Sequence, residues 1–180
     1  MKPVPQFRCA LSRREVEALA ARYVATNASQ EREDRLFRLV GPRARARGFL
    51  RRSEFLLLCD WKSPRSRPLV RANSAAAVTE VSRAALAAVD EVERGAILCR
   101  LTGVGWPTAS AILHVVLPDR WPLVDVRALE TLGVVAPSAY TRPFVAAYVA
   151  FCRDLASSLG VSLRTLDRAL WQASKEGVTV

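Results

Sequence analysis

Apolar residues recur every three to four positions along almost the whole chain, and this helical spacing is the feature that most restricts its fold. No segment alternates convincingly between apolar and polar residues, as a half-buried strand would. We therefore predict an all-α fold of about eight to ten helices, without internal repeats or low-complexity tails. A chain of 180 residues has room for one ordinary domain or for two small lobes that share a core.

Capping residues and prolines predict where the first helices begin and end. Ser12 and Glu15 form a capping box, and a second helix over residues 30–40 is expected to stop at Gly41 and Pro42. The first helix places five residues on one face: Val16, Leu19, Ala20, Tyr23 and Val24.

The remaining helices follow from the same signals. Ser53 is expected to cap a short, very apolar helix over residues 54–61, which an ordered loop follows up to Pro68. The later predicted helices are 73–89 capped by Asn73, 90–98 capped by Asp90, 107–117 closed by Pro118, 125–132, 142–159 capped by Thr141, and 163–175 capped by Ser162. We treat residues 1–180 as a single domain with a basic part (1–71), a central part (90–133) and C-terminal helices (137–176).

Positive charge is concentrated in the first part of the chain. Residues 1–71 hold 17 basic and 7 acidic side chains, whereas residues 72–180 hold 10 of each, so the net charge of +10 comes from the first part. All the basic residues except Lys2, Lys62 and Lys175 are arginine, whose planar fork suits phosphate oxygens. A polyanion is therefore the expected partner, and a coding bias toward Arg and Ala is the alternative origin of the arginines.

The cysteines and apolar segments argue against export, metal binding and membrane insertion. The four cysteines (Cys9, Cys59, Cys99 and Cys152) lack the clustering of a zinc or iron–sulfur site, so we interpret them as small core residues. Near the end of the chain the longest clean apolar run is 144–151, far shorter than the roughly 20 residues of a membrane span. Because the N-terminus lacks the apolar core of a signal peptide, we expect a cytoplasmic protein. The cysteine spacing leads us to expect no metal or cofactor.

A glycine-rich turn followed by a helix is the most informative motif. The turn is Leu-Thr-Gly-Val-Gly over residues 101–105, and Pro107 is well placed for the first turn of the next helix. Two glycines at this spacing let the backbone approach a neighbour closely and direct N–H groups outward at a helix N-terminus, which suits a phosphate. A packing turn between two helices is the alternative interpretation.

Residues 97–133 resemble the helix-hairpin-helix superfamily of DNA glycosylases, of the endonuclease III type. The family hairpin, Leu-Pro-Gly-Val-Gly-x-Lys-Thr-Ala, corresponds here to Leu-Thr-Gly-Val-Gly-Trp-Pro-Thr-Ala over residues 101–109, and the Val-Asp segment after it corresponds to Val124 and Asp125. The resemblance implies a two-lobed helical fold with a pocket between the lobes. It also implies a monomer that binds double-stranded DNA and is associated with the nucleoid.

The resemblance further implies roles for individual residues. Gly103, Val104 and Gly105 would hold a DNA phosphate, with a monovalent cation at carbonyls near Leu101 and Val104, and Asp125 would assist cleavage of the N-glycosidic bond. A carboxylate suits that step because glycosidic cleavage develops oxocarbenium charge, and the nucleotide must flip out because the bond is unreachable in a stacked duplex. The alternative role for Asp125 is to cap the helix that it precedes.

Two departures from the family pattern bear on the mechanism. Bifunctional members carry a nucleophilic lysine two residues after the second hairpin glycine, where this chain has Pro107, so we expect a monofunctional glycosylase. The four-cysteine cluster of some members is also missing, so no iron–sulfur cofactor is expected. Lys62 would be an alternative lyase nucleophile if it lay in the pocket.

Further DNA contacts are predicted from residue type and position. Trp106, Thr108 and Arg127 are candidates beside the hairpin and the aspartate; for Trp106 the alternative is packing, and for Arg127 an ion pair with an acid. A second group of candidates could stack on a base or wedge into the duplex: Trp61, Lys62, Arg65 and Arg67. The alternative is that Trp61 ends a core helix and the cations are solvated. Five arginines are expected to face DNA phosphates: Arg43, Arg45, Arg47, Arg51 and Arg52. The alternative is that they form a solvated surface without a ligand.

Two other residues are assigned structural roles, and three functions stay open. His114, the one histidine of the sequence, is expected in the core, and Trp121 is expected to anchor the segment that presents Asp125. The first hypothesis is a glycosylase that excises a damaged, mismatched or modified base, and the second is a helix-hairpin-helix protein that binds DNA without chemistry. The third is an RNA-binding or ribosome-associated helical protein.

Overall fold

The computed structural model describes residues 5–178, and these form two compact units. Unit 1 combines the residues up to 30 with those from 118 onward, and unit 2 consists of residues 31–117. No strand occurs within the described residues, so the predicted all-α class is confirmed. Residues 1–4, which begin the N-terminal segment interpreted above and include Lys2, lie outside the described part.

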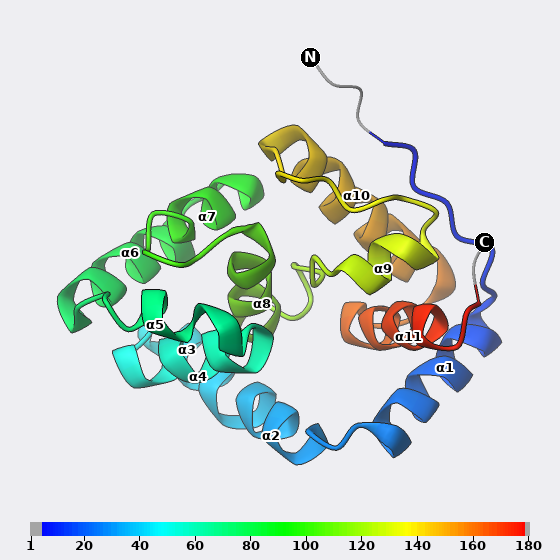
Figure 1. The fold of residues 1–180 in the computed structure, drawn as a ribbon, viewed down its shortest axis with the longest axis horizontal. Coiled ribbons are helices and arrows are strands. Elements are labelled where there is room, and N and C mark those ends of the chain that lie inside the picture. The colour runs from blue at the N-terminus through cyan, green and yellow to red at the C-terminus, as the bar shows by residue number, and fades with distance from the viewer. Residues whose placement is uncertain (1–4, 179–180) are drawn as a thin grey trace. The chain divides into compact units, whose positions relative to one another are not determined.

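Unit 1 brings together the first and last helices of the described residues. Figure 1 shows α1 and α11 side by side, and the Arg22 guanidinium of α1 binds both carboxylate oxygens of Glu176 at 2.9 and 2.8 Å. Leu19, Leu129 and Leu170 are among the side chains buried between the helices. The helices of unit 1 are α1 (Arg13–Thr26), α9 (Val126–Thr131), α10 (Arg142–Leu159) and α11 (Leu163–Lys175).

Unit 2 contains a central helix, α8 (Trp106–Val116), whose residues from Thr108 onward are all buried. Each large apolar side chain that is buried fully, such as Phe55 or Ile112, contributes about 2–3 kcal/mol to folding. The other helices are α2 (Gln30–Arg35), the π-helix η1 (Leu36–Val40), α3 (Gly41–Arg47), α4 (Arg52–Lys62), the 3-10 helix η2 (Pro64–Ser66), α5 (Arg67–Val70), α6 (Ala75–Ala87) and α7 (Glu91–Leu98).

The capping residues predicted most of the helix starts correctly. The capping box of Ser12 and Glu15 is present, and three further predicted caps accept a hydrogen bond from the backbone three residues on: Asp90, Thr141 and Ser162. The apolar face of the first helix is narrower than expected, because Tyr23 is only partly buried and Val24 is 39% exposed.

The prediction that a helix stops at Gly41 and Pro42 is wrong. The chain stays helical through η1 into α3, and Pro42 lies in the first turn of α3, where its missing N–H is tolerated. A Cβ on Gly41 would overlap the carbonyl oxygen of Val115, so this glycine allows α3 to approach α8. The helix ends instead at Gly48, which has a φ of 77°.

Three other expectations for unit 2, and the expected number of helices, are also corrected. Ser53 lies inside α4, because the Glu54 carboxylate accepts the Arg51 N–H at 2.8 Å and starts the helix earlier. The cap of α6 is Ser74 and not Asn73, since the Ser74 hydroxyl accepts the Ala77 N–H. The predicted loop after Trp61 contains η2 and the start of α5, and the described residues hold eleven α-helices in place of eight to ten.

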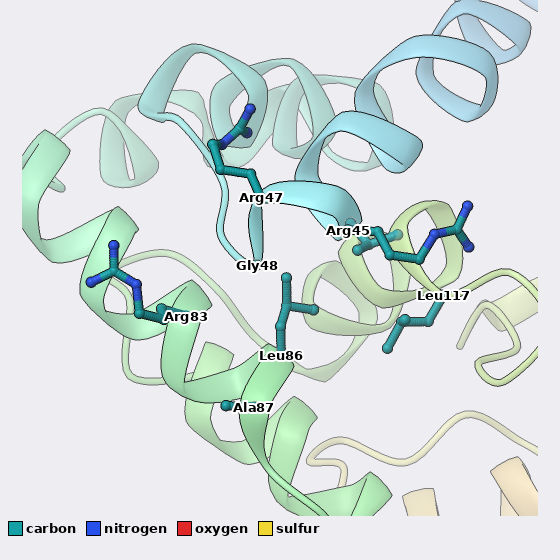
Figure 2. Close-up of a pocket in the computed structure, with 8 residues that line it drawn as sticks. Arg45, Arg47, Gly48, Arg83, Leu86, Ala87 and Leu117 are labelled. Atoms are coloured by element: carbon teal, nitrogen blue, oxygen red, sulfur yellow. The ribbon is translucent and has the colours of Figure 1, made fainter.

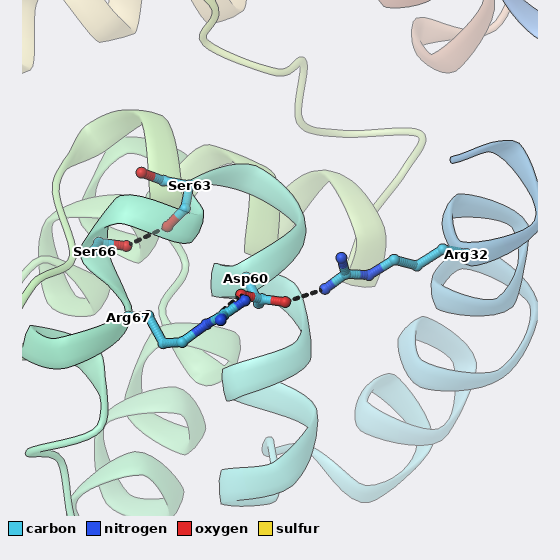
Figure 3. A network of polar contacts seen from close by, with 5 residues as sticks. All are labelled: Arg32, Asp60, Ser63, Ser66 and Arg67. Carbon is cyan, nitrogen blue, oxygen red and sulfur yellow. Dashed lines mark hydrogen bonds and ion pairs between the residues drawn. The ribbon is translucent and has the colours of Figure 1, made fainter. Parts of the chain in front are cut away.

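An ion-pair network on Asp60 connects three helices of unit 2 (Figure 3). Asp60 of α4 accepts from Arg32 of α2 at 2.6 Å and from the Arg67 Nε of α5 at 2.7 Å. These hydrogen bonds to Arg67 and Arg32 lower the pKa of the Asp60 carboxyl. Beside it, the Ser66 hydroxyl donates to the Ser63 carbonyl at 2.8 Å, which closes the turn between α4 and α5.

Among the described helices, none is by itself long and apolar enough to cross a bilayer. α10 and α11 meet the length and composition criteria only when taken together, and the chain bends by 102° between them.

Candidate functional site

The two hairpin glycines are required for different reasons. Gly103 has a φ of 78°, and a Cβ there would lie 2.7 Å from the Leu69 Cβ and 3.0 Å from the Val70 nitrogen of α5. Gly105 has an extended φ of −104°, and a Cβ there would meet only the Pro107 side chain, at 3.9 Å. Thus Gly103 is needed for the fold of the hairpin, whereas the space beside Gly105 is open to a ligand.

Asn73 holds the hairpin in place. This side chain is 6% exposed, and its amide donates to the carbonyl of Thr102 while its Oδ1 accepts the Thr102 N–H, both at 2.9 Å. The same amide donates to the Val70 carbonyl at 2.9 Å. The turn between α5 and α6 therefore fixes the backbone of the hairpin from the side of α5.

The hairpin leads directly into the N-terminus of α8. Gly105 is the N-cap residue, and α8 has no side-chain cap. The first-turn amides of Trp106 and Thr108 are therefore not satisfied by a capping side chain, and Pro107 between them has no N–H. The Val104 N–H donates to the Leu101 carbonyl at 3.1 Å, which closes the turn. Thr108 is buried, which does not support its predicted side-chain contact with DNA, and Trp106 is partly exposed.

Asp125 lies in unit 1, at the N-terminus of α9. Its Oδ1 accepts the Arg127 N–H at 3.0 Å, so the predicted capping role is present, and the side chain is partly exposed. Burial, together with the negative charge of Asp125, raises the pKa of Tyr140. The hairpin and Asp125 thus belong to different units.

Two buried side chains hold the backbone just before Asp125. The Tyr148 hydroxyl of α10 donates to the Leu123 carbonyl at 2.9 Å, and Asp167 of α11 accepts the Leu123 N–H at 3.0 Å. Burial raises the pKa of Tyr148 well above its ordinary value, so the hydroxyl remains a donor at neutral pH. Trp121 is 0% exposed, which confirms that it anchors this segment.

The five predicted phosphate-facing arginines differ in what they contact. Arg47 binds Glu54 and the Phe49 carbonyl, and Arg52 donates to the carbonyls of Asn73 and Arg71 at 2.8 and 2.7 Å. These two arginines therefore have structural partners inside unit 2. The exposed members of the set are Arg43, Arg45 and Arg51.

The structure places α3 near the C-terminal end of α8. Gly41 meets Val115 there, and Arg45 lines a cavity with Val116 and Leu117, so Arg45 lies toward the end of α8 opposite the hairpin. A shallow cavity of about 310 Å³ beside Arg45 has Leu86 and Leu117 in its wall. Figure 2 shows the guanidinium groups around it extending away from one another, so they do not converge on a single anion.

The predicted wedge segment is partly built into the fold. The Trp61 ring meets Phe37 edge-on, with the ring centroids 6.2 Å apart, and Lys62 beside it is partly exposed at the end of α4. Arg67 is bound to Asp60, whereas Arg65 is exposed. His114 is 2% exposed, as predicted for a core residue, and its ring meets the Phe37 ring edge-on with the ring centroids 5.2 Å apart.

Acidic, cysteine and histidine side chains do not gather into a metal-binding set. Within residues 5–178 no group of three or more could hold a metal ion. Cys59 and Cys152 are buried and Cys9 and Cys99 partly so, and burial raises the pKa of the Cys59 thiol to about 12. These thiols are therefore poor nucleophiles in the folded protein.

Sequence reasoning missed the residues that position the hairpin and the aspartate. Asn73 was interpreted as a helix cap, and Tyr148 and Asp167 had no assigned role beyond their helices. Their partners lie 29, 25 and 44 residues away along the chain, so no local pattern contains these contacts. For Tyr148 and Asp167 the available signal was a polar group within an otherwise apolar helix face, whereas Asn73, in the turn before α6, gave no signal beyond that of a cap.

Comparisons with family models and with curated proteins gave no match. Among solved structures, the chain is similar to an 8-oxoguanine glycosylase/lyase of Methanocaldococcus jannaschii, crystallised in complex with a 15mer DNA containing 8-oxoguanine. The two are 18% identical with a TM-score of 0.48, and the match covers 93% of this chain and 83% of the other. We therefore base the functional proposal on the residues and contacts of this chain.

Proposed function

We propose that this protein is a monofunctional DNA base-excision glycosylase. It would bind duplex DNA through the hairpin and a basic surface, and hydrolyse the N-glycosidic bond of a flipped damaged, mismatched or modified base with the help of Asp125. The observation that carries the proposal is the hairpin, in which Gly103 is held by α5 and Asn73 while Gly105 leaves the N-terminus of α8 open.

Phosphate binding at the hairpin has a direct physical basis. The first-turn amides of a helix carry partial positive charge and lack intrahelical partners, so they attract an anion. Because Gly105 has no side chain, a phosphate could approach these amides closely. The concentration of basic residues in the first part of the chain adds long-range attraction for a polyanion.

The chemistry assigned to Asp125 is glycosidic hydrolysis. As the bond between the sugar C1′ and the base nitrogen breaks, the carboxylate would stabilise the oxocarbenium charge on the sugar. Water then adds to C1′ and gives up a proton, the base leaves with the bonding electron pair and is protonated, and an abasic site remains. Tyr148 and Asp167 would fix the position of the carboxylate through Leu123.

A DNA-binding protein without catalytic activity is the second candidate. It is favoured by one specific observation, namely that Asp125 accepts the Arg127 N–H and so already has a capping function. Under this hypothesis the hairpin would bind DNA in the same way, and no base would be released.

Single-turnover assays on labelled duplexes test the proposal. The duplexes would carry uracil, alkylated purines, 8-oxoguanine, adenine mispairs or modified pyrimidines, and hot alkali would cleave the abasic sites. We expect alkali-dependent cleavage of at least one substrate. Salt-sensitive binding without cleavage of any of them would favour the second candidate.

Borohydride trapping tests the monofunctional part of the proposal. A lyase forms a Schiff base between an amine and the abasic sugar, and borohydride reduces it to a stable protein–DNA adduct. With Pro107 at the family's lysine position we expect no adduct. An adduct that disappears in Lys62→Gln would instead assign lyase activity to Lys62.

A further inference from the structure

A stripe of cationic and aromatic side chains follows one face of α11 in unit 1. Arg164, Arg168, Trp171 and Lys175 are spaced by four, three and four residues, which places them on one side of a helix. The opposite side of α11 contributes buried apolar residues to the core, including Leu166, Leu170 and Ala173.

Arg127 of α9 joins this stripe. The Arg127 guanidinium lies 5.1 Å and the Lys175 ammonium 5.3 Å from the Trp171 ring centroid. The Tyr23 ring of α1 meets Trp171 edge-on at 5.3 Å, and Arg168 lies 5.7 Å from the Tyr23 centroid. We call the set Arg127, Arg168, Trp171 and Lys175 the α11 cationic surface.

Acidic residues near this surface have partners outside it, and Glu176 also interacts with Lys175, whose charge helps to lower the Glu176 pKa. Glu176 is bound to Arg22, Glu130 accepts from the Ser174 hydroxyl at 2.6 Å, and the buried Asp167 accepts the Leu123 N–H. Residues 72–180 have no net charge as a whole, yet the spacing within α11 aligns Arg168 and Lys175, and the fold adds Arg127 of α9 to them. The surface thus has the combination of cations and aromatic rings that suits a nucleic-acid backbone.

We propose that the α11 cationic surface is a second DNA-contact surface, in which Arg127, Arg168 and Lys175 bind backbone phosphates. This inference rests on the DNA-binding part of the proposed function. It assigns phosphate contacts to residues 72–180, whose net charge is zero. A membrane is the less suitable partner, because α11 keeps its apolar face in the core and has none to insert into lipid.

The salt dependence of DNA binding tests this proposal. In the double variant Arg168→Gln/Lys175→Gln, the plot of log K against log salt should become shallower by about 1.8, since each lost phosphate contact removes about 0.9. Between 50 and 200 mM salt, the loss of affinity should shrink by roughly ten-fold relative to wild type. The control Arg14→Gln/Arg153→Gln removes the same charge from exposed positions outside the surface and should keep the wild-type slope.

Other outcomes of the experiment overturn the proposal. An unchanged slope in a double variant that melts like wild type would show that the surface does not bind DNA, even if the protein excises bases. Stronger binding to a matched RNA duplex or to anionic phosphatidylglycerol vesicles, lost in the same variant, would assign the surface to another partner. A shallower slope in a protein that excises no base would support this surface while removing the glycosylase proposal.

Discussion

At the scale of single residues, the two hairpin glycines separate folding from ligand binding. Gly103→Ala should destabilise the protein by about 1–3 kcal/mol, because alanine is strained at a φ of 78° and its methyl group would press against Leu69. Gly105→Ala should change stability by less than about 1 kcal/mol, because the site is open. It should nevertheless weaken DNA binding, since the methyl group would lie where the phosphate approaches.

Denaturant unfolding and duplex binding, measured on both variants, check this prediction. If Gly105→Ala bound DNA as tightly as wild type, the hairpin would not be the phosphate site.

The Tyr148 hydroxyl is predicted to position Asp125. Tyr148→Phe keeps the buried ring but leaves the Leu123 carbonyl without its donor, which should cost about 1–3 kcal/mol of stability. Single-turnover excision should slow while the affinity for DNA stays the same, because the change affects only the segment before Asp125. If Tyr148→Phe had this lower stability but excised the base at the wild-type rate, Tyr148 would have only a structural role.

At the scale of elements, Asn73 links the α5–α6 turn to the hairpin. Asn73→Asp keeps the acceptor for the Thr102 N–H but removes the amide that donates to the carbonyls of Thr102 and Val70. We expect a loss of about 2–4 kcal/mol, since two buried acceptors lose their donor and a charge is buried. Hydrogen exchange should rise first at the hairpin; protection there equal to wild type would contradict the proposed link.

Local signals predicted the helices well, but they did not predict how the helices contact one another. The caps at Ser12, Asp90, Thr141 and Ser162 are satisfied within one turn, so the sequence pattern contains all the information needed. Gly41 was misinterpreted because its role depends on Val115 of another helix.

The same limit applies to the candidate site. The hairpin could be predicted because the glycines and the next helix are contiguous. The supports of the hairpin and of Asp125 could not be predicted, since they come from helices that only the tertiary fold brings together.

At the scale of the whole molecule, the ion pair between Arg22 and Glu176 joins the first and last helices of unit 1. Hydrogen bonds from Arg22 and Gln172 lower the pKa of Glu176 from 4.5 to about 2. A carboxyl whose folded pKa is lowered stabilises the fold above its unfolded pKa, and this contribution is lost as the pH falls through the folded value.

Thermal melts should show this pH dependence. We expect Glu176→Gln to lower Tm relative to wild type at pH 5–7, and the difference to vanish as the pH falls from about 4.5 to 2. Glu80→Gln, which removes an exposed charge from α6, is the control. A difference that persisted unchanged below pH 2 would mean that the ion pair is not its source.

The residues assigned to the proposed function are divided between the two compact units. The hairpin belongs to unit 2, whereas Asp125, its supports and the α11 cationic surface belong to unit 1. Phosphate binding and glycosidic chemistry are therefore assigned to separate units, and substitutions in one should leave the function of the other measurable.

Excision by Asp125→Asn is the most direct measurement of the central claim, made on whichever duplex the wild-type protein cleaves. Asparagine caps a helix as well as aspartate does, so α9 and DNA binding should be preserved. It lacks the negative charge that would stabilise the oxocarbenium ion, so the single-turnover rate should fall roughly 100-fold or more. An Asp125→Asn protein that excises the base at the wild-type rate would contradict the assigned mechanism.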